Sequence, residues 1–304
     1  MEISIAPMLD LTNMYFRIFF RQISRNTLLF TEMIPLNAIL LADENRFLKI
    51  EKEEEPIALQ IGGSNPQNLK EAVKKANRYN YTEINLNAGC PSERVAKFGD
   101  FGASLMKNKG LTSDCLKAML DNTDKTVSLK TRIALDSGGY DEMRDFIGAC
   151  MEVGCKKFII HARNARLNLS PKANRSEKMI LRYDMVHRLK KELPNLTISI
   201  NGDIKTNEGI KEHEGLVDGV MIGRAAYYNP FFLNDTGITR KQVILNMLDY
   251  VEQNDIKPHH VFRHMIGLFH ECSGAKTFKK IISENTRSDI KQLKEAFKDF
   301  LNQL

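Results

Sequence analysis

The stretch IALQIGGSNPQNLKEAVKKANRYNYTEINLNAGCP, residues 57–91, predicts the repeating unit of the fold. Its two strand-like parts, Ile57–Gln60 and Glu83–Leu86, are short apolar runs of the kind that form buried strands. Between them, Asn65–Tyr79 begins with a capping Asn and a Pro in the first turn, and its apolar residues recur at helical spacing. A strand, a helix and a second strand in this order are typical of a parallel sheet.

Six more strand-like runs recur along the first three quarters of the chain, and helical patterns lie between most of them. The six runs are Ile3–Ala6, Leu28–Thr31, Thr126–Lys130, Lys157–Ile160, Thr197–Ile200 and Gly219–Ile222. Eight strands of this kind, alternating with helices over this total length, predict a closed (β/α)8 TIM barrel. The alternative is an open, doubly wound sheet. A dinucleotide-binding sheet of that kind has a GxGxxG sequence after its first strand, and this chain has none there.

The barrel is expected to span residues 1–235, and a small helical domain is expected over residues 236–304. The boundary is the turn-forming sequence Asn234-Asp235-Thr236-Gly237. Beyond it the pattern is helical throughout, and one helix opens at Pro258. The other helices expected there are Lys241–Asn254, Arg263–Phe269, Ala275–Ile282 and Ser288–Leu301. Their apolar residues fall at helical spacing, which favours the core of a bundle.

Composition narrows the class of protein. The net charge is +6, and Thr236–Leu304 holds eleven Lys and Arg against eight Asp and Glu, a mild excess consistent with a phosphate-rich partner. The five cysteines form no CxxC pair, which favours a reducing compartment and argues against a zinc site, so no metal is expected. No apolar run approaches the ~18 residues of a membrane span, and a strand expected from Ile3 leaves no room for a signal peptide. We therefore expect a cytoplasmic protein without a membrane partner, and a monomer, because no pattern indicates a dimer interface.

Polar residues and glycines follow nearly every predicted strand. In (β/α)8 barrels the carboxyl ends of the strands meet at one rim, which carries the active site. Cys90 lies there, in the sequence Asn87-Ala88-Gly89-Cys90-Pro91, among residues that favour a loop over a core. Such a thiol can act as a nucleophile or as a general acid. The alternative is a small buried residue at the end of a strand.

The same rim has the features of a binding site for flavin mononucleotide (FMN). Glycine-bearing turns follow the last two strands, at Asn201-Gly202-Asp203 and Gly223-Arg224, where phosphate-binding barrels hold a phosphate. Gln60 can hydrogen-bond the imide edge of a flavin, and Lys130 can place a cation over its ring. His161 can contact the ring or the phosphate. The alternatives are turns that are merely tight, and a histidine with a structural role.

The order of motifs along the chain resembles that of the tRNA-dihydrouridine synthases. The motifs are APMLDLTN, TEM, ALQIGGSNP, EINLNAGCPSERV with FGASLM, VSLKTRI, FIIHARNARLNLSPKANR, ISINGDI and DGVMIGRAAYYNP. The loop that ends in LSPKANR and the C-terminal RHMIGLFHECSGAKTFKKIISEN are most similar to the A-type branch, which modifies U20 and U20a in the D-loop of tRNA. The resemblance covers almost the whole chain.

The resemblance implies an enzyme that holds FMN in its barrel and tRNA on its helical domain, and that reduces the C5=C6 bond of uridine to give 5,6-dihydrouridine. NADPH would reduce the flavin again after each cycle. Cys90 would donate the proton to C5 while hydride passes from the flavin to C6, because C5 gains negative charge as the hydride arrives. The target base would have to leave its stack to reach the barrel.

The same resemblance assigns the remaining site residues. The flavin ring would be contacted by Pro7, Met8, Leu9, Gln60, Lys130 and His161, and its phosphate end by Asn201, Gly202, Asp203, Gly223 and Arg224. The tRNA would be bound by Asn87, which would face the target uracil, by Lys172 and Arg175 of the LSPKANR loop, and by Lys276, Lys279 and Lys280. For the three C-terminal lysines, the alternative is an ordinary solvated helix face.

The chain departs from the branch pattern in two places. Lysines replace the arginines common in the C-terminal stretch, which keeps the charge but loses the bidentate fork. Asp203 stands where a second Gly is usual. Two other functions compete with tRNA modification: a dihydroorotate dehydrogenase-like enzyme that acts on a free pyrimidine, and a tRNA-binding protein whose redox site is no longer used. The basic helical segment disfavours the first, and the presence of Cys90, Lys130 and His161 disfavours the second.

Overall fold

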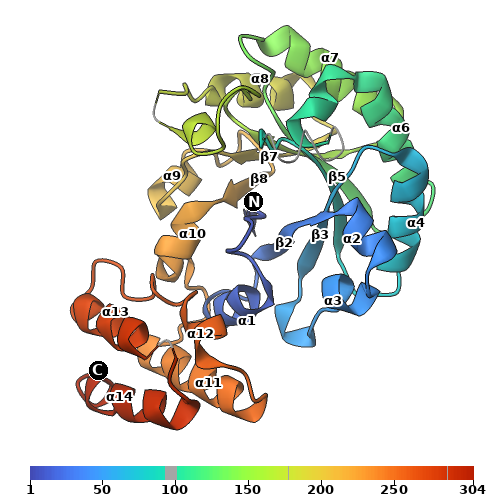
Figure 1. Ribbon diagram of the computed structural model, residues 1–304. Helices are drawn as coiled ribbons and strands as arrows, with labels where there is room; N and C mark the ends of the chain where they lie inside the picture. The colour runs from blue at the N-terminus through green and yellow to red at the C-terminus, as the bar shows by residue number, and fades with distance from the viewer. Residues whose placement is uncertain (93–100, 177, 286) are drawn as a thin grey trace.

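Within the residues that the computed structural model describes, 1–92, 101–176, 178–285 and 287–304, eight parallel strands close into a barrel (Figure 1). The strands are β1 (Glu2–Ile5), β2 (Leu28–Pro35), β3 (Ile57–Gly62), β4 (Glu83–Ala88), β5 (Thr126–Arg132), β6 (Lys157–His161), β7 (Thr197–Asn201) and β8 (Gly219–Ile222). Each strand pairs with its neighbour in sequence, and β8 closes the barrel on β1, where Ile3 lies opposite Val220. The predicted TIM barrel and all eight of its predicted strands are confirmed.

Helices surround the barrel (Figure 1), and their buried apolar side chains form one core cluster with those of the strands. Side-chain caps fix where several of them begin: Asn13 accepts from the N–H of Phe16, and Asn65 accepts from the N–H of Asn68. The described helices between β1 and β8 are α1 (Met14–Ile23), α2 (Leu36–Leu41), α3 (Glu44–Leu48), η1 (Lys52–Glu54), α4 (Pro66–Ala76), η2 (Gly102–Lys107), α6 (Lys109–Leu120), α7 (Tyr140–Glu152), η3 (Ala173–Arg175), α8 (Tyr183–Glu192) and α9 (Asn207–Lys211). Those labelled η are short 3-10 helices.

The interior of the barrel is divided between apolar and polar side chains. The apolar part is a buried cluster formed by Ala6, Leu28, Phe30, Ala58, Ile159 and Met221. The polar part is formed by side chains of β3, β4 and β5, namely Gln60, Glu83, Asn85 and Ser128, each at most 1% exposed. Buried polar groups cost free energy unless they are hydrogen-bonded, so the members of this second group require one another as partners.

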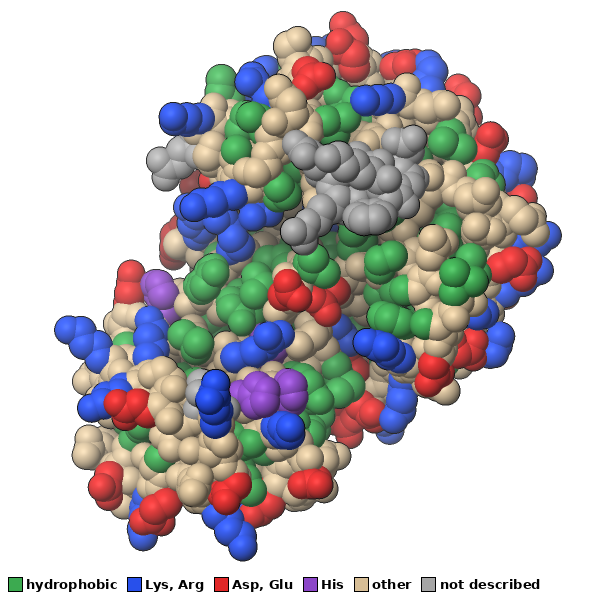
Figure 2. Space-filling model, viewed as in Figure 1, with side chains coloured by type: hydrophobic (Ala, Val, Ile, Leu, Met, Phe, Trp, Pro, Cys, Tyr) green, Lys and Arg blue, Asp and Glu red, His purple; other side chains and the backbone are tan. Residues whose placement is uncertain are grey.

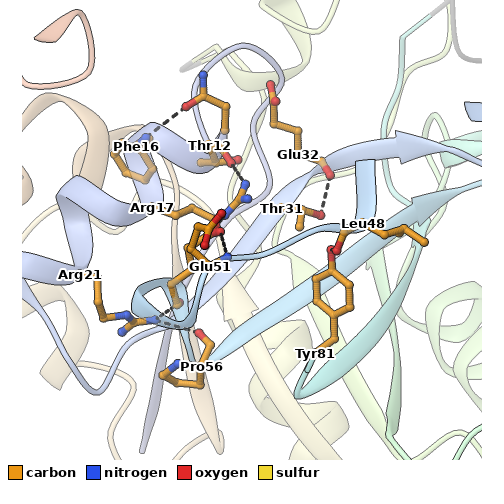
Figure 3. Close-up of polar contacts among 12 residues, drawn as sticks. Thr12, Phe16, Arg17, Arg21, Thr31, Glu32, Leu48, Glu51, Pro56 and Tyr81 are labelled. Atoms are coloured by element: carbon orange, nitrogen blue, oxygen red, sulfur yellow. Dashed lines mark hydrogen bonds and ion pairs between the residues drawn. The ribbon is translucent and has the colours of Figure 1, made fainter. Parts of the chain in front are cut away.

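A buried cluster of charged groups connects α1 to the segment before β3 (Figure 3). Arg17 donates from Nε to the carboxylate of Glu54 and from Nη1 to the carbonyl of Thr12, both at 2.6 Å. Arg21 donates to the carbonyls of Ser24, Arg25, Thr27, Glu54 and Pro56. The N–H of Met8 donates to the hydroxyl of Thr12 at 2.9 Å. The cluster therefore fixes the loop that follows β1.

After β8 the described chain continues through α10 (Arg224–Tyr228) and η4 (Pro230–Leu233) into a helical segment that packs beside α1 (Figure 1). Its helices are α11 (Arg240–Gln253), α12 (Pro258–Phe262), α13 (Ala275–Glu284) and α14 (Ile290–Asn302). A cluster of aromatic rings forms its core, made of Phe262, Phe269, Phe278, Phe297 and Phe300. Among the described residues, every helix falls short of the length and apolarity that crossing a membrane requires.

The helix predicted over Arg263–Phe269 is wrong. This stretch forms successive turns, in which N–H groups bond three residues back, as Met265 does to Phe262. The physical reason is the close approach of Gly267 to the end of α10: a Cβ at this position would lie 2.6 Å from the carbonyl oxygens of Tyr227 and Tyr228. The apolar spacing of the stretch indicates which residues are buried, but the close packing at Gly267 determines the backbone conformation.

Candidate active site

The predicted site residues of the barrel lie at the carboxyl ends of its strands. Asn87 of β4 is opposite Lys130 of β5, and His161 of β6 is opposite Asn201 of β7. Lys130 Nζ donates to Asn201 Oδ1 at 3.3 Å, although β6 separates their two strands. Side chains from four consecutive strands thus converge at the mouth of the barrel.

Cys90 lies in a loop that hydrogen bonds hold against this rim. Asn87 Oδ1 accepts from the N–H of Gly89 at 3.1 Å and from that of Cys90 at 3.0 Å. The carbonyl of Cys90 accepts from the N–H of Ala103 at 2.8 Å, and Arg132 Nε donates to the carbonyl of Gly89 at 3.0 Å. Cys90 is partly exposed, unlike a core cysteine. The rest of the predicted loop motif, residues 93–100, lies outside the described residues.

Positive charge is concentrated around His161, which has Lys130, Arg132, Arg163 and Arg175 within electrostatic range. Burial, followed by repulsion from Arg132, lowers the pKa of Lys130 to about 7. Burial also lowers the pKa of Arg132 to about 10 and that of His161 well below its usual value. His161 Nδ1 has no hydrogen-bond partner among the described residues. A buried cationic cluster with an orphaned polar atom suits an anionic ligand that can form hydrogen bonds.

The two predicted phosphate turns differ in the space around them: a Cβ on Gly202 would lie 3.0 Å from Leu181, whereas the surroundings of Gly223 are open among the described residues. Gly202 has a φ of +133°, which L side chains rarely adopt, and Asp203 follows with +49°. The Asp203 carboxylate pairs with Arg163 at 2.7 Å and lies 3.9 Å from Arg224, so cations balance its charge. After β8, a Cβ on Gly223 would meet no atom of the described residues within 4 Å. The described part of the chain therefore leaves the space in front of this turn open.

The loop after β1 borders the mouth of the barrel and contains Pro7–Leu9, of which Leu9 is 71% exposed. The N–H of Asp10 donates to the carboxylate of Glu32, and burial raises the pKa of that carboxyl. Figure 2 shows apolar side chains gathered at the centre of this face, with Lys and Arg side chains beside them. An apolar floor next to cationic groups suits a planar ring that carries negative charge.

The predicted tRNA contacts fall in two separate places. Arg175, in η3, lies within electrostatic range of Cys90 and Arg224, and Lys172 is exposed in the same loop. The C-terminal three, Lys276, Lys279 and Lys280, are exposed on α13, which belongs to the helical segment (Figure 1). The structure thus brings the LSPKANR loop to the rim and leaves the C-terminal lysines on a different surface.

Two buried arginines organise the rim, and sequence analysis assigns neither of them a role. Arg132 donates to the carbonyls of Gly89, Asn164 and Asn174, which connects the Cys90 loop to the LSPKANR loop. Arg163 donates to the carbonyl of Met179 and to Asp203. For Arg132 a signal was available, because it lies two residues from Lys130 on the same strand and so points to the same face.

These features define a (β/α)8 barrel protein with a cysteine loop and a buried cationic cluster at its carboxyl rim. A cluster of side chains able to hold a metal ion is absent from the described part of the chain. The family model of the dihydrouridine synthases matches residues 4–303, and the chain belongs to this family.

Similar proteins match nearly the full length of the chain. The tRNA-dihydrouridine(20/20a) synthase of Haemophilus ducreyi is 46% identical over 297 residues, which cover 93% of this chain and 91% of that protein. Proteins of the same name from Escherichia coli (strain K12) and Pseudomonas aeruginosa are 44% and 42% identical, and the matches cover 97% and 92% of this chain and 90% and 88% of those proteins.

A solved structure of a morphinone reductase mutant in complex with tetrahydroNAD has a similar fold. Its TM-score is 0.54 at 10% sequence identity, over 81% of this chain and 86% of that one. At this identity the similarity concerns the fold alone.

Proposed function

We propose that the protein is an FMN-dependent synthase that reduces uridines at positions 20 and 20a of the tRNA D-loop to dihydrouridine. Membership of the dihydrouridine synthase family, and relatives named tRNA-dihydrouridine(20/20a) synthases, support dihydrouridine formation in tRNA. The observation that carries the proposal for this chain is the position of Cys90, within electrostatic range of Lys130, Arg132 and Arg175 at one rim. A thiol beside buried cations suits chemistry on a base next to an anionic cofactor.

The phosphate of FMN would bind at the two glycine turns. The open space in front of Gly223 and the cation of Arg224 support this assignment. Backbone N–H groups of Asn201–Asp203 would border the same space. Because Arg163 neutralises Asp203, the carboxylate in this turn does not exclude an anion.

The flavin ring would lie over the mouth of the barrel, against the loop Pro7–Leu9. Lys130 would face the ring, and His161 Nδ1 would gain the partner that it lacks among the described residues. Gln60, the predicted partner of the imide edge, is fully buried and its carboxamide is bonded to Asn87 and Asn85, so Lys130 and His161 carry the fit to the ring. The polar groups present at this rim therefore fit the cofactor.

When bound, reduced FMN would supply the hydride for C6 of the uracil, and NADPH would supply the reducing equivalents. Cys90 would hold the proton for C5, and its backbone is fixed for this purpose by the carboxamide of Asn87. Negative charge that develops on the base would be stabilised by Lys130 and Arg132. Water would be excluded by the target base itself once it has left its stack.

The tRNA would contact both the rim and the helical segment. Lys172 and Arg175 would contact the nucleotides around the target, and Lys276 and Lys279 would contact phosphates. Residues 1–235 would then be the catalytic domain and residues 236–304 the tRNA-binding domain. Folded RNA of this kind is recognised largely by shape and by phosphate contacts.

The test is to map the D-loop uridines by mass spectrometry after the purified protein has been incubated with FMN, NADPH and dihydrouridine-free tRNA. A gain of two hydrogens at position 20 or 20a, abolished or greatly slowed in Cys90→Ala, supports the reaction, the position and the acid together. A gain at another position would keep the reaction and overturn the assigned site. No gain, with a bound and reducible flavin, would point to a free pyrimidine as the substrate.

A further inference from the structure

A continuous chain of hydrogen-bonded side chains leads from the Cys90 loop down into the interior of the barrel. It begins at Asn87, whose Oδ1 holds the N–H groups of Gly89 and Cys90. Asn87 Nδ2 donates to Gln60 Oε1 at 2.7 Å, and Gln60 Nε2 donates in turn to Asn85 Oδ1 at 2.7 Å. Each of these carboxamides is therefore engaged at both its oxygen and its nitrogen.

The chain continues to the amino-terminal end of the strands. Asn85 Nδ2 donates to Ser128 Oγ at 2.6 Å, and the Ser128 hydroxyl donates to the carboxylate of Glu83. Glu83 is 1% exposed and pairs with the ammonium of Lys157 at 2.8 Å, which also pairs with Glu2 at 2.8 Å. The interior of the barrel thus connects its lower end to the loop of the candidate acid at its upper rim.

All donors in this chain point in the same direction, toward Glu83. A carboxylate can only accept, so Ser128 has to donate its single hydrogen to it. The oxygen of Ser128 is then left to accept from Asn85, and the same logic fixes the orientation of Gln60 and of Asn87. A carboxamide alone could adopt either of two orientations with the same shape. Two groups remove this freedom: the N–H groups of Gly89 and Cys90 favour the observed order from the rim, and Glu83 enforces it from the opposite end.

We propose that Glu83 is a positioning residue: it sets the orientation of the three carboxamides above it and thereby holds the Cys90 loop in place. The inference rests on the proposed function, because it matters for catalysis only if Cys90 is the acid. The critical orientation is that of Asn87. With its amide reversed, an NH2 group would face the N–H groups of Gly89 and Cys90, and the loop would no longer be anchored.

The variant Glu83→Gln tests the direction of the chain with almost no change of shape. Lys157 has only donors, so it favours the orientation in which the oxygen of the new carboxamide faces its ammonium. The NH2 group would then face Ser128, whose hydroxyl would have to donate to Asn85 instead. The reversal would propagate to Asn87, or the chain would contain two opposed donors at some point. Adding Lys157→Met removes the ammonium that causes the reversal. The oxygen of the carboxamide at position 83 can then face the hydroxyl of Ser128.

The measurement is the rate at which iodoacetamide alkylates Cys90 in the flavin-bound protein, followed by peptide mass spectrometry. Cys272, also partly exposed but in the helical segment, serves as the internal reference. Relative to Cys272, Glu83→Gln should change the Cys90 rate by about tenfold, the effect of removing one buried hydrogen-bond partner. In Glu83→Gln/Lys157→Met the rate should return to within about twofold of the original protein, because the donor–acceptor order is restored.

An unchanged Cys90 rate in folded Glu83→Gln overturns the proposal, and so does a double variant as altered as the single one, since that would indicate simple loss of packing. Should Glu83→Gln not fold, Ser128→Ala removes only the hydroxyl that connects Glu83 to Asn85. The alkylation rate of Cys90 in Ser128→Ala should change in the same direction as in Glu83→Gln. An unchanged rate overturns the proposal as well.

Turnover gives a second reading. In Glu83→Gln, oxidation of the reduced flavin by tRNA should slow, because this step uses the Cys90 loop. Reduction of the flavin by NADPH does not use the loop and should keep its rate. If the unaltered protein forms no dihydrouridine, the proposed function fails, but alkylation needs neither tRNA nor turnover and still decides the role of Glu83.

Discussion

Arg263 of the helical segment donates from Nη2 to the carbonyl of Asp10, in the loop after β1, at 3.2 Å. The same guanidinium donates from Nε to His264 Nε2 at 3.1 Å, and His264 Nδ1 lies 3.2 Å from the hydroxyl of Tyr227. Burial and the charge of Arg263 lower the pKa of His264 to about 3, so the imidazole stays neutral and can accept from Arg263. The bond between Arg263 and Asp10 connects the segment proposed to bind tRNA to the loop proposed to contact the flavin.

Replacing Arg263 should loosen the flavin loop. Arg263→Gln removes the donor to Asp10, and FMN should dissociate several-fold faster, on the order of one hydrogen bond. The release of FMN after dilution can be followed by its fluorescence. The matched control is Lys291→Gln, an exposed cation on α14, which should leave the rate unchanged. Equal rates in the two variants would show that the contact between Arg263 and Asp10 does not stabilise the loop.

Cys90→Ala should keep the flavin but abolish the reaction. Removal of a general acid slows a reaction by about 100-fold or more, because the proton for C5 then has to come from water. Dihydrouridine in tRNA can be quantified by mass spectrometry, and bound FMN by its absorbance. Cys272→Ala, in the helical segment, is the matched control and should retain activity. Full activity in Cys90→Ala would exclude this thiol as the acid.

Binding of FMN should take up a proton at Lys130. In the ligand-free protein the pKa of Lys130 is lowered to about 7, so above that pH the amine is mainly neutral. A negatively charged ligand favours the ammonium, so the affinity for FMN should fall by up to about tenfold per pH unit as the pH rises above about 7. Fluorescence titration of the apoprotein measures this slope. Lys130→Met should bind FMN more weakly at neutral pH and lose most of the slope; an unchanged slope would assign the proton to another group.

The buried ion pair of Arg17 and Glu54 should be important for stability. Glu54→Gln leaves the guanidinium of Arg17 buried without its counter-charge, and this should lower the free energy of unfolding by about 3–5 kcal/mol. The exposed pair of Glu71 and Lys74 provides the comparison, since Glu71→Gln should cost less than about 1 kcal/mol. Urea denaturation of both variants measures the difference, and similar midpoints would contradict it.

Affinity for tRNA should depend steeply on salt if the lysines of α13 contact phosphates. Each lysine that no longer neutralises a phosphate should reduce the slope of log affinity against log salt by roughly 0.7–0.9, so Lys276→Gln/Lys279→Gln should reduce it by about 1.4–1.8. Filter binding at several salt concentrations gives the slope. The control is Lys74→Gln/Lys117→Gln, two exposed lysines on α4 and α6. A flat salt dependence in the unaltered protein would rule out this surface as the main binding surface for tRNA.

Much of the barrel and its rim could be predicted because the signals are local. Each strand is a short apolar run, and parallel strands bring residues that follow them to the same edge, as with Asn87 and Lys130. The helical pattern at Arg263–Phe269 was misleading because a close approach at Gly267 decides that conformation, and such packing has no trace in the periodicity of the stretch.

The chain of side chains below Asn87 could not be predicted from the sequence. Glu83 and Ser128 lie 45 residues apart, and only the register between β4 and β5 makes them partners. In the sequence, Glu83 resembles any charged residue at the start of a strand. Its burial follows from the closure of the barrel, which encloses the inward-facing side chains of β3, β4 and β5.

Arg132 donates at once to the carbonyl of Gly89, beside Cys90, and to that of Asn174, in the LSPKANR loop. One guanidinium thus holds both loops, so neither can shift without the other. If the second loop senses the RNA, substitutions that adapt it to a different substrate also displace the thiol. Substrate range and turnover are then coupled through this one residue.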